Sequence, residues 1–302
     1  MGSHPIQQRL ERGELILLDG ALGTELERRG VATPLPLWSA QALLDAPDAL
    51  RSVHEEYARA GSDILATDTF RTTPRTMEKA GRPAGDAGRL TEAAVRIAKE
   101  ARERGAGGRS VWIGGSMGPL EDCYHPEDAP PADAMEREHA DQALLLKRAG
   151  VDLLLLETLN RIDEAEAAAR AARATGLPFT VSFVCRGGPR LYSGEALADA
   201  VRAVAPLEPV AVLVNCTPLD EVAACLDVTS RTTDLPFGCY PNAGTVDASG
   251  RWSFDPSVTP ERFAGLAREW IRTGAQVIGG CCGTGPEHIR ALREALPLVL
   301  VE

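Results

Sequence analysis

Three cysteines that end apolar runs are the residues of this chain best suited to chemistry. Cys281 and Cys282 are adjacent and follow a run that closes with two glycines, and Cys216 closes a second run. Glycines let a chain turn sharply after a strand, and Pro286 with Glu287 is typical of the first turn of a helix. Buried cysteines are often only small core residues. Three thiols at strand ends could instead form one metal site beside a helix N-terminus.

Such a site has the composition expected for zinc. Zn²⁺ is usually held by four tetrahedral ligands, so three protein sulfurs leave one position open for a substrate. Coordination can deprotonate a thiol, and the site would then activate a sulfur nucleophile. The histidines do not follow any of the apolar runs, so cysteine is the expected ligand. They are His4, His54, His125, His139 and His288.

Other polar residues also follow apolar runs. Asp19 and Asp68 could each cap a following helix. Glu157 directly follows four leucines, and an ionised carboxylate beside a buried strand is costly unless it has a partner. A cationic ligand is one candidate partner for Glu157. Trp38 and Phe70 are candidate aromatic neighbours for a methyl donor that carries a positive charge.

Eight apolar, β-rich runs alternate with segments of helical period, which predicts repeated βα units around a parallel sheet. This pattern favours an α/β protein with a closed (β/α)8 TIM barrel as a single domain over residues 1–302, with 1–4 a cloning remnant or disordered. An open doubly wound sheet is the alternative, but it lacks the glycine fingerprint of dinucleotide-binding proteins. The eight predicted strands are 14–19, 62–69, 111–116, 151–158, 178–184, 209–216, 236–240 and 275–282.

Composition limits the function classes. The chain has 302 residues, 44% hydrophobic and 25% charged, with a net charge of −11, which argues against nucleic-acid binding. It has no apolar run of transmembrane length and no secretory signal, so neither a membrane partner nor export is expected. Seven cysteines without a regular framework fit reduced thiols in the cytoplasm. The proline-rich stretch 126–133 could be a lid over the barrel or only a connector.

Six motifs give the sequence a specific resemblance. It resembles the homocysteine S-methyltransferase family, which includes betaine-homocysteine methyltransferase and the homocysteine domain of cobalamin-dependent methionine synthase. The resemblance covers nearly the whole chain. Its motifs are Leu-Asp-Gly-Ala-Leu-Gly-Thr at 18–24, Asp-Thr-Phe at 68–70, Glu-Thr at 157–158, Val-Asn-Cys at 214–216, Tyr-Pro-Asn-Ala-Gly at 240–244 and Gly-Gly-Cys-Cys-Gly-Thr at 279–284.

The resemblance implies a zinc-dependent barrel that binds homocysteine as a thiolate and methylates it to methionine. It assigns zinc to Cys216, Cys281 and Cys282, with Asn242 as a fourth ligand that homocysteine displaces. The positions that it assigns to the amino acid substrate include Asp19, Gly20 and Glu157. Thr158 and Asn215, which lie in the same motifs, are also expected at the substrate.

The methyl donor is the open question at this stage. Betaine-using members resemble one another in a tyrosine where this chain has Thr158, so the sequence favours a sulfonium donor, S-methylmethionine or S-adenosylmethionine. Betaine as the donor, or another thiol or selenol as the acceptor, stays an alternative. Alternatives of other classes are a phosphate-binding barrel lyase or isomerase and a non-catalytic zinc protein. Homo-oligomers occur in the resembled family, so a homo-oligomer is also considered.

Overall fold

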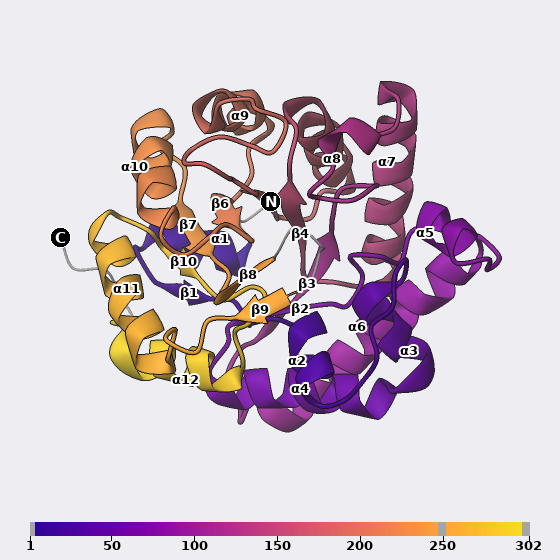
Figure 1. Cartoon of the computed structure of the whole chain (residues 1–302), viewed down its shortest axis with the longest axis horizontal. Coiled ribbons are helices and arrows are strands. Elements are labelled where there is room, and N and C mark those ends of the chain that lie inside the picture. Colours follow the sequence, from indigo (N-terminus) through magenta and orange to yellow (C-terminus); the bar gives the residue numbers. More distant parts are fainter. Residues whose placement is uncertain (1–3, 247–251, 298–302) are drawn as a thin grey trace.

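Eight parallel strands form a nearly closed barrel surrounded by helices (Figure 1). The structure is a computed structural model that describes residues 4–246 and 252–297. All eight predicted runs contain a strand, so the predicted (β/α)8 barrel is confirmed and the open sheet was wrong. In spatial order the strands are β1 (Ile16–Leu17), β10 (Val277–Ile278), β7 (Phe237–Tyr240), β6 (Ala211–Asn215), β5 (Phe179–Phe183), β4 (Leu153–Leu159), β3 (Trp112–Met117) and β2 (Ile64–Ala66).

Carboxylates help to join the two ends of this sheet. The Asp63 N–H donates to the Leu17 carbonyl at 2.7 Å, and the Leu17 N–H donates to the Asp63 side chain at 2.9 Å. Nearer the other end of these strands, the Ala66 N–H donates to the Asp19 carboxylate, also at 2.9 Å. Buried backbone N–H groups need acceptors, and here side chains supply part of what a regular ladder would supply.

The helices begin and end with residues that suit their positions. Proline occupies the first helical position of α4, α5, α11 and α12, where its missing N–H is not needed. Gly61, Gly150 and Gly176 follow α4, α7 and α8 with positive φ, which glycine adopts without strain. The helices are α1 (Pro5–Glu11), α2 (Gly23–Arg28), α3 (Ala42–Asp45), α4 (Pro47–Ala60), α5 (Pro74–Lys79), α6 (Asp86–Gly105), α7 (Ala132–Ala149), α8 (Ile162–Thr175), α9 (Leu197–Val204), α10 (Val222–Thr232), α11 (Pro260–Arg272) and α12 (Pro286–Ala295), with short 3-10 turns η1 (Trp38–Gln41), η2 (Pro126–Asp128) and η3 (Ala205–Leu207).

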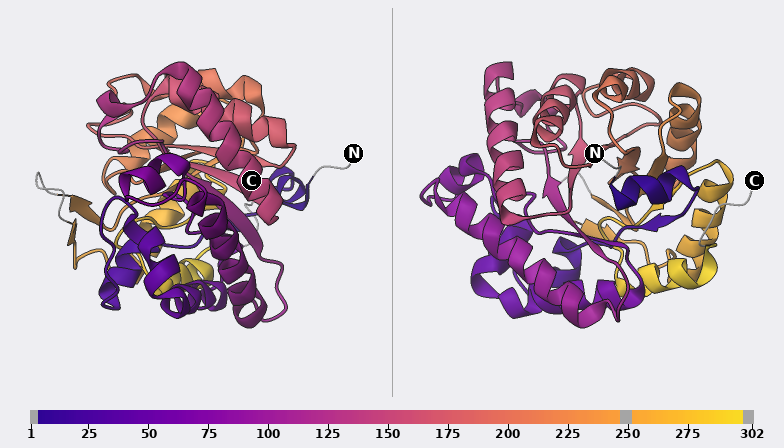
Figure 2. Two further views of the ribbon diagram at one scale, coloured as in Figure 1. Left: turned by 90° about the vertical axis from the view of Figure 1, so that its right-hand side faces the viewer. Right: turned by 180° about the vertical axis from the view of Figure 1, so that it is seen from behind.

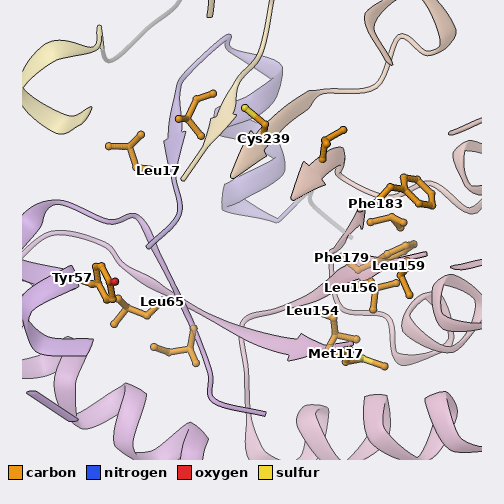
Figure 3. Packing of buried hydrophobic residues seen from close by; sticks show 14 of the residues in the cluster. Leu17, Tyr57, Leu65, Met117, Leu154, Leu156, Leu159, Phe179, Phe183 and Cys239 are labelled. Atoms are coloured by element: carbon orange, nitrogen blue, oxygen red, sulfur yellow. The ribbon is translucent and has the colours of Figure 1, made fainter. Parts of the chain in front are cut away.

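Two hydrophobic layers follow from the alternation of side chains along the strands. In β4, Leu153 and Leu155 belong to the inner cluster, which fills the barrel. Leu154 and Leu156 belong to the outer cluster, which packs between the strands and the helices (Figure 3). The barrel therefore has a packed centre rather than a pore, and a functional site must lie at one end of the strands.

Two elements were not predicted, and they lie on opposite sides of the barrel. Helix α1 buries Ile6 and Leu10 in the inner cluster, and the hairpin of β8 (Gly244–Val246) and β9 (Trp252–Phe254) projects from the other side (Figure 2). His4 caps α1 by accepting a hydrogen bond from the Ile6 N–H at 3.3 Å, so it is part of the fold, whereas residues 1–3 lie outside the described residues. No helix in the described ranges is long and apolar enough to span a bilayer.

Candidate active site

The three predicted thiols meet at one end of the barrel. Cys216 directly follows β6, and Cys281 and Cys282 lie in the turn between β10 and α12. Their sulfur atoms all lie within 4.8 Å of one another, and Cys281 is the most accessible of the three. The structure therefore brings Cys216 together with Cys281 and Cys282, which lie 65 and 66 positions later in the sequence, in an arrangement that could hold a metal ion.

The glycines around this turn are required by close contacts. A Cβ atom at Gly280 would lie 2.1 Å from Thr284 Oγ1, and one at Gly283 would lie 2.8 Å from the Ala243 carbonyl oxygen. Gly283 also has a φ of +87°, a conformation that other residues rarely adopt. Thr284 in turn donates from its hydroxyl to the Cys281 carbonyl at 2.7 Å. The glycine-rich motif thus packs the two cysteines closely against their neighbours.

Asn215 and Thr158 hold the third cysteine. The Asn215 side chain accepts from the Thr158 N–H at 2.9 Å and donates to the Thr158 hydroxyl at 2.8 Å. Both side chains contact Cys216 Sγ, at 3.6 Å from Asn215 and 3.7 Å from Thr158. Thr158 and Cys216 have φ values of 60° and 49°, which are strained for residues other than glycine. These hydrogen bonds hold the strained backbone in place beside the sulfur.

Asn242 lies next to the same cysteine. Its amide group donates to the Cys216 carbonyl at 2.8 Å, and its own N–H donates to the Thr217 carbonyl at 3.2 Å. The Asn242 Oδ1 atom is buried and has no hydrogen-bond partner among the residues that the structure describes. A buried, unpaired amide oxygen beside three thiols fits a fourth metal ligand.

The thiols share protons in a way that favours a cation. Hydrogen bonds from Cys216 and, to a smaller extent, from Cys282 lower the pKa of Cys281 well below its usual value. The hydrogen bond with Cys281 correspondingly raises the pKa of Cys216. The mutual hydrogen bonds of the cluster therefore favour the thiolate form of Cys281, and a thiolate is the form of cysteine that binds a metal cation.

Glu157, near the end of β4, lies beside this cluster. Burial raises its pKa to about 7, the hydrogen bond from Ser116 opposes the shift, and the negative charge of Cys281 adds to it. The Ser116 hydroxyl donates to the Glu157 carboxylate, and Tyr240 donates its hydroxyl to Ser182 at 2.6 Å nearby. Of these neighbours none is cationic, so a positively charged ligand would stabilise the ionised carboxylate.

Asp19 is more engaged in the fold than its sequence position suggests. It is 4% exposed, and its carboxylate accepts the Ala66 N–H described above. Burial raises its pKa well above the usual value, and the charge of Glu157 contributes to the shift. The neighbouring Gly20 is fixed by packing, since a Cβ atom there would lie 2.7 Å from the Tyr57 hydroxyl. Asp19 therefore lies within electrostatic reach of Glu157 while it joins β1 to β2.

The sequence did not identify Tyr124 as a site residue. Burial raises its pKa far above the usual value, and the charges of Cys216, Cys281 and Cys282 all add to the shift, so its phenol is within electrostatic reach of the thiols. Its ring centroid lies 5.3 Å from that of Tyr192. The only signal was its place in the loop after β3, in front of the proline-rich stretch.

The other four cysteines lie in the core. Each is buried and free of disulfides, and none belongs to the three-thiol cluster. They are Cys123, Cys185, Cys225 and Cys239. Trp38 and Phe70 pack edge to face with ring centroids 6.2 Å apart, and both are partly exposed. Their placement relative to a bound donor stays a prediction.

Comparison with known proteins gives a consistent result. The family model described as homocysteine S-methyltransferase matches residues 16–296. The chain is 32% identical to the homocysteine S-methyltransferase YbgG of Bacillus subtilis, over 96% of both chains, and 29% identical to the selenocysteine methyltransferase of Astragalus bisulcatus, over 95% of this chain and 94% of that protein. The crystal structure of the metallated Escherichia coli homocysteine methyltransferase MmuM matches with a TM-score of 0.84 and 32% identity, over 96% of this chain and 99% of that one.

These similarities decide between the classes that the sequence left open. The metallated relative and the three-thiol cluster agree with the predicted zinc cofactor. The phosphate-binding barrel and the non-catalytic zinc protein give way to a methyltransferase, because the named relatives match over nearly the full chain. The chain belongs to the homocysteine S-methyltransferase family.

Proposed function

We propose that this protein transfers a methyl group from a small sulfonium compound to the sulfur of homocysteine, with zinc held by Cys216, Cys281, Cys282 and Asn242. The observation that carries the proposal is the cluster of three sulfurs within 4.8 Å of one another beside the carboxylate of Glu157. The donor set fits zinc, since three thiolates and a neutral amide oxygen make a four-ligand site. Bound zinc would supply a Lewis acid that keeps the homocysteine sulfur as a thiolate at neutral pH.

The residues around the cluster suit the rest of the amino acid. Homocysteine carries its ammonium group a short chain away from its sulfur, and Glu157 lies close enough to Cys281 to feel its charge. An ammonium group at Glu157 would give this partly buried carboxylate a cationic partner and a charge-assisted hydrogen bond. Asp19 would secure the ends of β1 and β2 beside this ammonium position. Asn215 and Thr158 would act as positioning residues for the Cys216 sulfur.

The reaction needs little acid or base from the protein. The homocysteine sulfur attacks the donor methyl group, the bond from that carbon to the sulfonium sulfur breaks, and the donor leaves as a neutral thioether. The only proton released is the one that the thiol loses on binding. Catalysis then consists of holding the two sulfur atoms in line across the methyl group. This agrees with a site that is built from thiols, amides and carboxylates and in which no described histidine lies at a strand end.

The sulfonium donor is favoured over betaine by the role of Thr158. Its hydroxyl contacts Cys216 Sγ and its backbone is bonded to Asn215, so this position serves the ligand cysteine. A threonine at this position also offers no aromatic face to a quaternary ammonium group. A selenol acceptor is a second candidate, because one relative is named as a selenocysteine methyltransferase.

Zinc content and methionine formation test the proposal together. We expect about one zinc per chain in the wild type, and methionine from homocysteine with S-methylmethionine or S-adenosylmethionine in preference to betaine. Cys216→Ala should lose zinc and activity and keep its circular dichroism spectrum. Cys225→Ala is the matched control: it also removes a buried thiol, but one from α10, and should retain both. An active Cys216→Ala variant, or a zinc-loaded wild type that turns over no sulfonium donor, would contradict the proposal.

A further inference from the structure

Asp68 is a buried carboxylate to which neither the fold nor the proposed homocysteine site gives a full set of partners. It follows β2, at the same end of the strands as the thiol cluster, and is 2% exposed. The Ser39 hydroxyl donates to its Oδ1 atom at 2.6 Å. Its Oδ2 atom is buried and has no hydrogen-bond partner among residues 4–246 and 252–297. Such an oxygen is uncommon in a folded protein and calls for a ligand or a functional role.

The charge of Asp68 is unpaired as well. Burial raises its pKa to about 6, against the hydrogen bond from Ser39, so the carboxylate is largely ionised at neutral pH. The cation nearest in sequence, Arg71, is engaged elsewhere: its guanidinium lies 5.4 Å from the centroid of the Phe70 ring and donates to the Glu121 carbonyl at 3.1 Å. No cation within the described ranges forms a salt bridge with Asp68. A buried anion without a partner is strongly unfavourable.

Two aromatic residues are sequence neighbours of Asp68 and of Ser39, its hydrogen-bond partner. Trp38 precedes Ser39, and Phe70 lies two residues after Asp68. The two rings meet edge to face at an interplanar angle of 74°. Two glycines leave space for them, since a Cβ atom at Gly23 would lie 2.5 Å from Trp38 and one at Gly118 would lie 2.4 Å from Phe70.

Trp38 also has a strained backbone. Its φ is 50°, a value that residues other than glycine rarely adopt and that is enriched at ligand sites. Both rings are partly exposed while Asp68 is not, so a ligand would meet the rings first.

This group lies near the sulfur cluster. The hydroxyl of Thr69, the residue after Asp68, donates to the Ser116 carbonyl at 2.7 Å. The Ser116 hydroxyl in turn donates to the Glu157 carboxylate, which lies beside the thiol cluster. A donor held by the rings would therefore lie at the same end of the barrel as the thiols.

We propose that Asp68, together with Trp38 and Phe70, binds the positively charged sulfur of the methyl donor. This inference rests on the proposed function and specifies its donor site. Aromatic faces attract cations, and the carboxylate supplies the counter-charge that the site otherwise lacks. A donor with its own carboxylate one carbon from the cation, such as betaine, would be repelled by Asp68. A sulfonium centre separated from its carboxylate by several carbons would not be, so Asp68 also determines donor specificity.

Cation binding without turnover tests this inference. The probe is the trimethylsulfonium ion, which has neither an amine nor a carboxylate, titrated into zinc-loaded protein and followed by saturation-transfer nuclear magnetic resonance. Asp68→Asn keeps the shape and an acceptor for Ser39, and we expect it to bind the probe at least ten times more weakly. Asp152→Asn is the matched control, because Asp152 immediately precedes β4, at the opposite end of the strands, and it should bind as the wild type does.

The outcomes separate this inference from the proposed function. Equal binding by the wild type and Asp68→Asn, or no saturable binding by the wild type, would overturn the inference. In turnover, Asp68→Asn should raise the KM for the sulfonium donor at least tenfold and leave zinc content and the KM for homocysteine unchanged. If the wild type forms methionine and the donor KM does not change in the variant, the inference is wrong and the proposed function stands. If the probe binds in an Asp68-dependent manner but no sulfonium donor is turned over, the proposed function is wrong and the cation site stands.

Discussion

His54 gives the sharpest prediction about stability. It lies in α4, is 0% exposed, and neither ring nitrogen has a hydrogen-bond partner among the described residues. Burial alone lowers its pKa from 6.5 to about 4. The folded protein therefore excludes a proton that the unfolded chain binds, and the protein should lose stability as the pH falls through the range between these two values.

The size of the loss follows from the two pKa values. One pKa unit corresponds to about 1.4 kcal/mol, so His54 should lower the free energy of unfolding by about 2 kcal/mol between about pH 7 and about pH 5. For a chain of 302 residues this corresponds to a decrease in melting temperature of about 3 °C. His54→Leu has no titrating group, and it also removes two unpaired buried nitrogens. We expect the variant to be more stable than the wild type already at neutral pH, by roughly 1–3 kcal/mol.

The assay is urea unfolding of both proteins at the two pH values, followed by tryptophan fluorescence and circular dichroism. Other titrating groups act in both proteins, so the wild type minus variant difference isolates His54. The exposed His125 provides the control. On acidification, His125→Gln should lose nearly the same free energy of unfolding as the wild type. If His54→Leu loses as much stability as the wild type on acidification, then His54 is not held neutral by burial and the reasoning fails.

Two further predictions concern the site. Gly280→Ala should lower the free energy of unfolding by about 1–3 kcal/mol and reduce zinc content, because its Cβ would lie 2.1 Å from Thr284 Oγ1; Gly88→Ala in α6, where the nearest atom is 3.6 Å away, should instead stabilise by about 1 kcal/mol in the same urea titration. Glu157→Gln keeps an acceptor for Ser116 but loses its charge, so steady-state kinetics should give a KM for homocysteine about ten to a hundred times higher with zinc content unchanged. If only the KM for the methyl donor rises, Glu157 binds the donor and not homocysteine, and this prediction is wrong.

Much of the fold was predictable because the strands are continuous apolar runs with polar residues at their ends. The runs that form β4 and β6 are buried along most of their length, and a short continuous apolar run is sufficient to predict a strand of a buried parallel sheet. Helix α1 was missed because seven residues with two buried side chains give too short a pattern. The hairpin of β8 and β9 was missed because Asn242 and Gly244 read as turn residues.

The site was predictable only where chemistry is carried by residue type. Three cysteines at strand ends indicate a metal without any knowledge of the fold. Tyr124 was not predictable, since a tyrosine in a loop gives no sign of which residues it will face. The unpaired oxygen of Asp68 was also invisible, because a residue after a strand reads equally well as a helix cap.

The position of α1 has a consequence for the order of events in catalysis. Ile6 and Leu10 extend the packed centre on the side of the barrel opposite the hairpin (Figure 2). Under the proposed function, both substrates would therefore approach from the side of the hairpin. Under the proposed function, homocysteine at the thiols would lie beneath a donor held at the aromatic rings. Binding and release would then be ordered: homocysteine would bind before the donor, and the demethylated donor would leave before methionine.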